Sequence, residues 1–252
     1  MKPAVLSRMR ESLHEPFARR GFRPLTSSLT VFAFASALAG ALVAARIAVT
    51  HRFQVLYLIW NLFLAWLPLL FALAVWREAG TRVPRRKRVF AAGAAWLLFF
   101  PNAPYIFTDL VHLAKLHASA TAPPWFDLLL HLLFAMIGLM IGFASLAVMH
   151  KLVERAWGWR TGWLFALGAL ALAGFGIYLG RFERWNSWDV LLSPFALLGD
   201  IAAPFLAPWN HPRTWGFSVV CFLFLAISYL LCSQFGQLCA GQREPCAGRS
   251  EA

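Results

Sequence analysis

The sequence predicts an all-α fold: a polytopic membrane helix bundle of about six transmembrane helices, with a short re-entrant or interfacial helix near residues 190–206. Two observations on composition favour this class. Apolar residues make up 60% of the 252 residues, the mean hydropathy is +0.62, and only 13% of the residues are charged. A soluble domain carries about a quarter charged residues. The third observation is that the apolar residues fall in long runs, and about 20 such residues cross the hydrocarbon layer as a helix.

Six apolar runs are long enough to span a bilayer, and together they form a predicted bundle domain over residues 27–235. The spans lie at about residues 27–48, 55–76, 89–107, 126–149, 162–180 and 214–235. A basic leader, residues 1–26, precedes them, and residues 236–252 form a polar tail that we expect to be disordered. The first run continues well past Gly40, which favours an uncleaved helix over a signal peptide.

Residues 190–206 form a seventh apolar stretch, but it is short and contains Pro194 and Asp200. A charge at the centre of a bilayer costs roughly 2.5–3.5 kcal/mol. We therefore expect this stretch to lie at the interface or to re-enter the membrane.

The orientation follows from the distribution of Lys and Arg. The leader and residues 77–88 each carry six, residues 151–160 carry three and the tail carries two, so this side holds 17, whereas the opposite side holds six. Because basic residues concentrate on the cytoplasmic side, both termini are predicted to be cytoplasmic. The basic segments are then expected to contact anionic lipid headgroups, and the same segmentation argues against nucleic acid as a partner despite the net charge of +12.

The third span is interrupted by two prolines in the sequence FFPNAPYIF. Pro101 and Pro104 have no N–H and should end regular helix within the span. The carbonyls that lose their partners must be buried in protein or line a wet cavity, and we expect the Asn102 amide to satisfy them. The alternative is a simple kink that ends the span near the headgroups.

Two glycine pairs at helical spacing are typical of close helix packing. Gly138 and Gly142 lie in the fourth span, and Gly176 and Gly180 lie in the fifth. Small residues four apart share one helix face, so these pairs favour close contact between spans four and five.

The most polar stretches, which follow spans three and five, are both predicted to emerge on the outer face. Candidate acid–base residues are Asp109, Asp189 and His112. Candidate substrate-binding residues are Asn102, Tyr105, Thr108, Arg181, Glu183, Arg184, Trp185 and Asn186. If spans three and five pack together, Asp109 should pair with Arg181 or Arg184. Interfacial anchoring and a structural salt bridge are the alternative interpretations.

Neither a metal nor a cofactor is predicted. The chain lacks an H-E-x-x-H or C-x-x-C motif, and it lacks Walker, Rossmann, kinase and G-x-S-x-G motifs. Asp127 and His131 lie four apart at the start of span four, where we expect Asp127 to cap the helix and His131 to be a satisfied interior histidine.

The segments PNAPYIFTDLVHL, residues 101–113, and GRFERWNSWD, residues 180–189, resemble the bacterial membrane-protein family catalogued as domain of unknown function 1361. The resemblance covers roughly residues 30–235. It implies a multi-pass membrane protein and implies no known activity, substrate or cofactor.

Three classes of function stay open. The first is an accessory or assembly factor whose outer polar patch docks a membrane-protein partner. The second is a membrane enzyme that acts on a lipid-linked or periplasmic anionic substrate. The third is a small transporter, but ionisable residues inside the spans are few, and Asn61 is the clearest polar group at mid-span.

Overall fold

The structure, a computed structural model, describes residues 22–81, 83–113 and 122–241. Most of the predicted leader and the end of the predicted tail lie outside the described residues. The elements in order are α3 Phe22–Thr50, α4 Leu56–Ala79, α5 Arg86–Phe99, α6 Asn102–Tyr105, the 3-10 helix η1 Ile106–His112, α8 Pro124–Trp157, α9 Trp159–Phe182, α10 Asp189–Leu192, α11 Pro194–Leu206, the 3-10 helix η2 Pro208–Asn210 and α12 Pro212–Gly241.

Six stretches are long and apolar enough to cross a membrane, which confirms the prediction of an all-α polytopic bundle. They are Ser27–Thr50, Leu56–Ala79, Arg86–His112, Pro124–Trp157, Trp159–Phe182 and Pro212–Phe235. At 13 residues, α11 is too short to span, because it reaches only about 20 Å. The last helix, α12, continues past the predicted boundary at residue 235 to Gly241.

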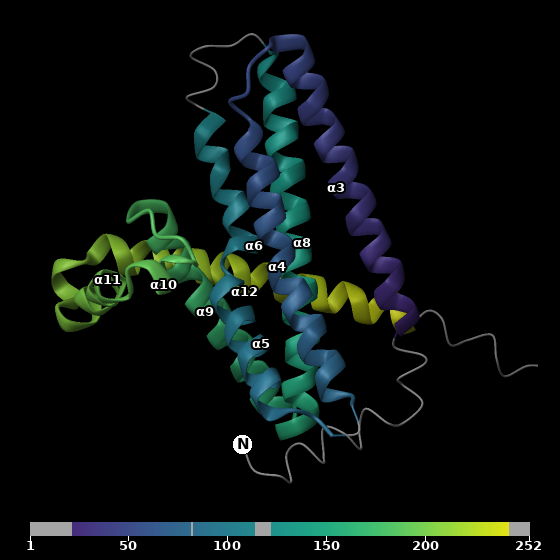
Figure 1. Cartoon of the computed structure of the whole chain (residues 1–252), viewed down its shortest axis with the longest axis vertical. Helices are drawn as coiled ribbons and strands as arrows, with labels where there is room; N and C mark the ends of the chain where they lie inside the picture. The colour runs from purple at the N-terminus through teal and green to yellow at the C-terminus, as the bar shows by residue number, and fades with distance from the viewer. Residues whose placement is uncertain (1–21, 82, 114–121, 242–252) are drawn as a thin grey trace, which may run out of the picture.

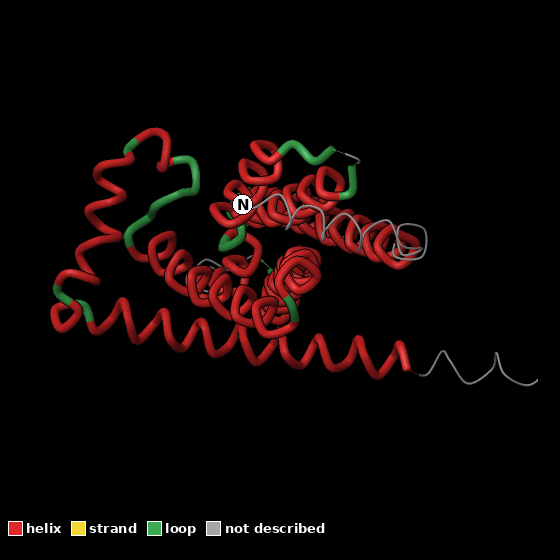
Figure 2. The backbone as a smooth tube through the Cα atoms, turned by 90° about the horizontal axis from the view of Figure 1, so that it is seen from below, coloured by secondary structure: helices red, strands yellow, loops and turns green. Residues whose placement is uncertain are grey.

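The helices are splayed and do not form a parallel bundle. In Figure 1, α3, α4 and α8 run side by side along the long axis, and α8 packs against α3, α4 and α9. The last helix, α12, packs along α9 and crosses the long axis steeply, and Figure 2 shows it along one edge of the molecule. The short helices α10 and α11 project to the side of the bundle (Figure 1).

Two clusters of buried side chains hold the helices together. One cluster, which includes Trp96, Leu170 and Leu225, joins α5, α8, α9 and α12. The other, which includes Leu58 and Phe134, joins α3, α4 and α8. Because lipid tails are as apolar as these side chains, close packing and interhelical hydrogen bonds hold such helices together, and transfer from water contributes little.

The third span breaks at its prolines. Regular helix ends at Phe99, the short helix α6 follows, and the chain continues as the 3-10 helix η1. One expectation needs correction, because Asn102 does not reach a freed carbonyl itself. Its Nδ2 donates to Ser187 Oγ over 2.9 Å, and Ser187 Oγ donates to the Leu98 carbonyl over 3.1 Å. Ser187 therefore satisfies the broken helix, and Asn102 holds Ser187 in place.

The glycine pairs make room for this broken segment. A Cβ at Gly138 would lie 2.8 Å from the Ala103 carbonyl oxygen, and one at Gly176 would lie 2.8 Å from Pro101 Cγ. Spans four and five do pack against each other, as predicted, but the glycine pairs do not form that contact. Each pair instead faces residues 101–105, so α8 and α9 receive the irregular backbone of span three between them. This contact fixes the position of the polar residues that follow.

Candidate functional site

Asp109 on η1 joins three spans at the end of the bundle where His112 lies, hereafter the His112 end. Its side chain is 2% exposed. Asn61 Nδ2 of α4 donates to Oδ2 over 2.7 Å, and Arg181 Nη1 of α9 donates to Oδ1 over 3.2 Å. A charge near lipid is stable only when it is paired and hydrogen-bonded, and both conditions are met here. The structure thus places Asp109 beside Arg181, one of the two predicted partners.

Arg181, in the last turn of α9, is held by several groups of span three. Its Nη1 lies 3.1 Å from His112 Nε2 and 3.4 Å from the Tyr105 hydroxyl oxygen, and its Nη2 donates to the Thr108 carbonyl. The guanidinium also lies over the Tyr105 ring, 5.7 Å from its centroid. Gly180 permits this approach, because a Cβ there would lie 3.2 Å from Tyr105 Cε2. Arg181 is therefore held by Tyr105 of α6 and by Thr108, Asp109 and His112 of η1.

A second buried ion pair lies beside the first. Arg46 of α3 donates to both carboxylate oxygens of Asp127 on α8, over 2.6 and 2.9 Å. The expectation that Asp127 caps α8 is wrong, because its side chain makes no capping bond. His131 is a satisfied interior histidine: Nδ1 contacts the Asp127 carbonyl and Nε2 contacts the Tyr57 hydroxyl, each over 2.7 Å.

Tyr57 of α4 links the two ion pairs. Its hydroxyl contacts His131, and its ring packs edge-on against the His112 ring with the centroids 5.4 Å apart. Contacts therefore run from α3 through α8, α4 and η1 to α9, and the step between Tyr57 and His112 is a ring contact. Arg46 Nη1 is buried without a hydrogen-bond partner, and the hydrogen bonds and ion pairs of the other groups fix the relative positions of these helices at the His112 end.

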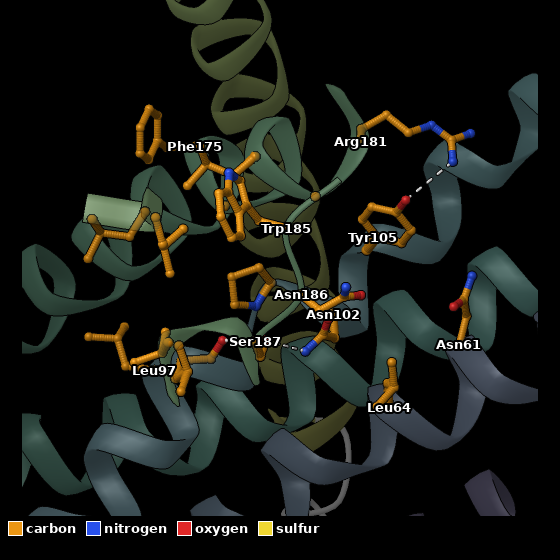
Figure 3. A pocket seen from close by; sticks show the side chains of 18 of the residues that line it. Asn61, Leu64, Leu97, Asn102, Tyr105, Phe175, Arg181, Trp185, Asn186 and Ser187 are labelled. Carbon is orange, nitrogen blue, oxygen red and sulfur yellow. Dashed lines mark hydrogen bonds between the residues drawn. The ribbon is translucent and has the colours of Figure 1, made fainter. Parts of the chain in front are cut away.

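A pocket of about 760 Å³ opens next to this network. Its volume lies within the range of ligand pockets, about 300–1,000 Å³. Figure 3 shows Arg181, Tyr105 and Asn61 on one side and Phe175 and Leu97 on the other. The polar or aromatic lining residues are Tyr57, Trp60, Asn61, Asn102, Tyr105, Asp109, His112, Arg181, Trp185, Asn186 and Ser187, and the apolar ones include Leu97, Leu98, Leu172, Phe175, Val190, Leu197, Ile201 and Phe205.

Along each of three spans, the residues that line the pocket change from apolar to polar toward the His112 end. On α9, Leu172 and Phe175 precede Arg181, which is about 14 Å from Leu172 at 1.5 Å per residue. The third span places Leu97 before Asn102 and the residues of η1. On α4, which runs the opposite way, Asn61 lies nearer the His112 end than Leu64. The pocket is therefore amphipathic, with its polar part at the His112 end.

The loop after α9 contributes only part of its predicted residues to the pocket. Trp185 and Asn186 line it, whereas Glu183, Arg184 and Asp189 do not. Glu183 accepts a hydrogen bond from Tyr178, and Arg184 is exposed with φ 61°. Asp189 accepts from the Asn186 backbone N–H over 2.7 Å and so shapes the turn.

The remaining predicted residues belong to the third span. Asn102, Tyr105, Asp109 and His112 line the pocket, whereas Thr108 is buried and bonds the Tyr105 carbonyl through its hydroxyl. Tyr57, Trp60 and Ser187 also line the pocket and were not among the residues predicted from the sequence. The four-residue spacing of Tyr57 and Asn61, which puts both on one face of the second span, was the available signal.

The side chains that line the pocket include groups suited to proton transfer and groups suited to hydrogen bonding. The Asp109 carboxylate and the His112 imidazole reach the pocket and are of the types that transfer protons. The amides of Asn102 and Asn186 can donate to and accept from a ligand. Within the described ranges, no group of three or more His, Cys, Asp or Glu side chains is placed to hold a metal ion.

The fold and the pocket define a class: a multi-pass helical membrane protein with an amphipathic pocket at one end of its bundle. A comparison with known families shows the family of the chain. The family described as "Protein of unknown function (DUF1361)" matches residues 60–228, and the chain belongs to this family. The matched range includes both sequence motifs and most of the pocket. No solved structure matches the chain.

Proposed function

We propose that this protein binds an amphipathic, lipid-linked molecule in the pocket, with the apolar chain between α5, α9 and α11 and the polar head at the His112 end. The observation that carries the proposal is the common direction of polarity along three spans. A lipid in one leaflet has the same arrangement, with an apolar tail about 15 Å deep and a polar head at the surface. Enzymatic action on such a molecule would use Asp109 or His112, which lie at the head.

The position of α11 supports a lipid as the source of the ligand. Its side chains Leu197, Ile201 and Phe205 form one wall of the pocket, and its other large apolar side chains, such as Phe195 at 87%, are exposed. A helix that is apolar on both sides at a membrane surface is in contact with lipid on its outside. A chain can therefore enter from the bilayer along this helix.

The test is saturable labelling by a single-chain amphiphile that carries a photoreactive group at the end of its chain. The purified protein is placed in phosphatidylcholine vesicles, and the probe is added at rising mole fraction. Labelling of the lipid-exposed surface rises in proportion to the probe, whereas labelling of a pocket saturates. The proposal predicts saturable labelling in peptides from α5, α9 and α11.

Two exposed alanines on α5 provide matched variants. Ala94 lines the pocket and Ala91 does not. We expect Ala94→Trp to abolish the saturable component because the indole fills the space, and Ala91→Trp to leave it unchanged. Labelling that is linear in probe, or that is equal in the two variants, would contradict the proposal.

We also propose that the protein lies in a bacterial inner membrane with both termini cytoplasmic, so that the His112 end faces outward. The support is the 17-to-6 distribution of Lys and Arg. The same basic segments would then contact anionic headgroups at the cytoplasmic face. Reporter fusions should read cytoplasmic after Arg88 and at Ala252 and periplasmic after Arg213. A periplasmic signal at Ala252 contradicts six spans.

An accessory or assembly factor is the second candidate function. Its support is the exposed apolar surface beside the pocket, where Leu206 is 84% and Trp209 is 92% exposed. Large exposed apolar patches mark contact with a protein or with a membrane. A photoreactive residue at position 209 distinguishes the two: a discrete protein adduct in cells supports a docking partner, and lipid adducts alone contradict it.

A further inference from the structure

The polar end of the pocket contains a cation that is already neutralised. Arg181 is the one Lys or Arg among the described lining residues, and its guanidinium contacts Asp109, Tyr105, His112 and the Thr108 carbonyl. A guanidinium has five N–H donors, and at least three of them point at protein acceptors here. Arg181 therefore has at most two N–H donors left for a ligand.

An anionic headgroup is poorly matched to this environment. It would lie near the Asp109 carboxylate, which is 2% exposed, with no second Lys or Arg among the described lining residues to balance it. Burying an unpaired charge is costly, and the cost rises when a like charge is close. Arg184, the other arginine predicted to hold an anion, is exposed and does not line the pocket.

The groups that remain available are neutral. The Asn102 amide uses one hydrogen on Ser187, and the Asn186 amide uses one on Asp189, so both side-chain carbonyl oxygens are left as acceptors. The aromatic rings of Trp60, Tyr105 and Trp185 line the same pocket. Amide oxygens accept from hydroxyl groups, and aromatic faces pack on the C–H surface of a sugar ring.

We propose that the headgroup bound at the His112 end is uncharged and rich in hydroxyl groups, so that the ligand is a lipid-linked sugar. The inference rests on the proposed lipid-binding function and names its ligand class. The chain is held between α5, α9 and α11, and the sugar lies between the amides and the rings, next to the Asp109–Arg181 pair.

The test compares an alkyl glucoside with an alkyl phosphate that carries the same photoreactive chain, in phosphatidylcholine vesicles. We expect the glucoside to saturate the pocket at a concentration about tenfold lower than the phosphate. Methyl glucoside, which has no chain, should not displace it at the same concentration. Equal or tighter binding of the alkyl phosphate overturns the assignment of an uncharged headgroup. Displacement by methyl glucoside overturns the inference that the sugar is linked to a lipid chain.

Variants of two neighbouring exposed residues localise the effect. Asn186→Ala removes a pocket acceptor and should reduce the preference for the glucoside several-fold, with the saturable labelling by the chain retained. Arg184→Ala, outside the pocket, should change neither. An unchanged preference in Asn186→Ala contradicts the headgroup assignment alone. If neither probe saturates, the lipid-binding function is overturned, and the headgroup assignment with it.

Discussion

Replacing Gly138 with alanine should destabilise the protein, because Gly138 lies against the broken backbone of span three. The added Cβ would be 2.8 Å from the Ala103 carbonyl oxygen and 2.8 Å from Ile106 Cδ1. Overpacking of this kind costs about 1–3 kcal/mol. Alanine is also the better helix former, by about 0.8–1.0 kcal/mol. Since one neighbour is a backbone atom that cannot rotate away, we expect a net loss of about 1–2 kcal/mol in the free energy of unfolding.

The matched control is Gly168→Ala in α9, where a Cβ would meet nothing within 4 Å. Only the helix preference acts there, so this variant should be more stable than the wild type by up to about 1 kcal/mol. Both variants are unfolded by denaturant in a mild detergent and followed by circular dichroism. If Gly138→Ala unfolds with the same free energy as Gly168→Ala, the packing of α6 on α8 described above is wrong.

Three further predictions use the same unfolding measurement or its local equivalent. Arg46→Ala leaves the Asp127 carboxylate buried and unpaired, so we expect a loss of about 3–5 kcal/mol, and a loss below about 1 kcal/mol would mean that the pair is hydrated. Ser187→Ala removes the hydroxyl that bonds the broken helix, and it should cost about 1–3 kcal/mol, whereas wild-type stability refutes that role. Asp200→Ala frees the Trp185 indole N–H and should speed hydrogen exchange in α11 with little change in global stability; unchanged exchange contradicts the role of this contact in holding α11.

The spans could be predicted because membrane insertion depends on run length and polarity, which are local properties of sequence. The steep crossing of α12 could not, since tilt is set by packing against neighbouring helices. The break at Pro101 and Pro104 was predictable from the chemistry of proline. The residue that hydrogen-bonds a carbonyl freed by this break could not be predicted, because Ser187 is 89 positions away from its acceptor, Leu98, in the chain.

Of the two buried ion pairs, one could be predicted from the sequence and the other could not. Asp109 was expected to pair with Arg181 or Arg184, because charges near lipid are normally paired and the stretches after spans three and five hold most of the charge on the predicted outer face. The Arg46–Asp127 pair was missed: Asp127 stands at a helix start, where carboxylates usually cap or interact with the helix dipole. Local sequence cannot distinguish that role from an ion pair with another span. The pocket itself depends on α11, whose position relative to α9 no sequence pattern reports.

The most direct test of the central claim is an experimental structure of the protein in lipid nanodiscs, determined with a bound fiducial to increase its size. The account predicts an elongated ligand or lipid density in the pocket between α5, α9 and α11, with its polar end beside Asn102. It also predicts that the Asp109 carboxylate lies within about 4 Å of the Arg181 guanidinium. A pocket closed by α11, with Asp109 and Arg181 apart and no density between these helices, would contradict it.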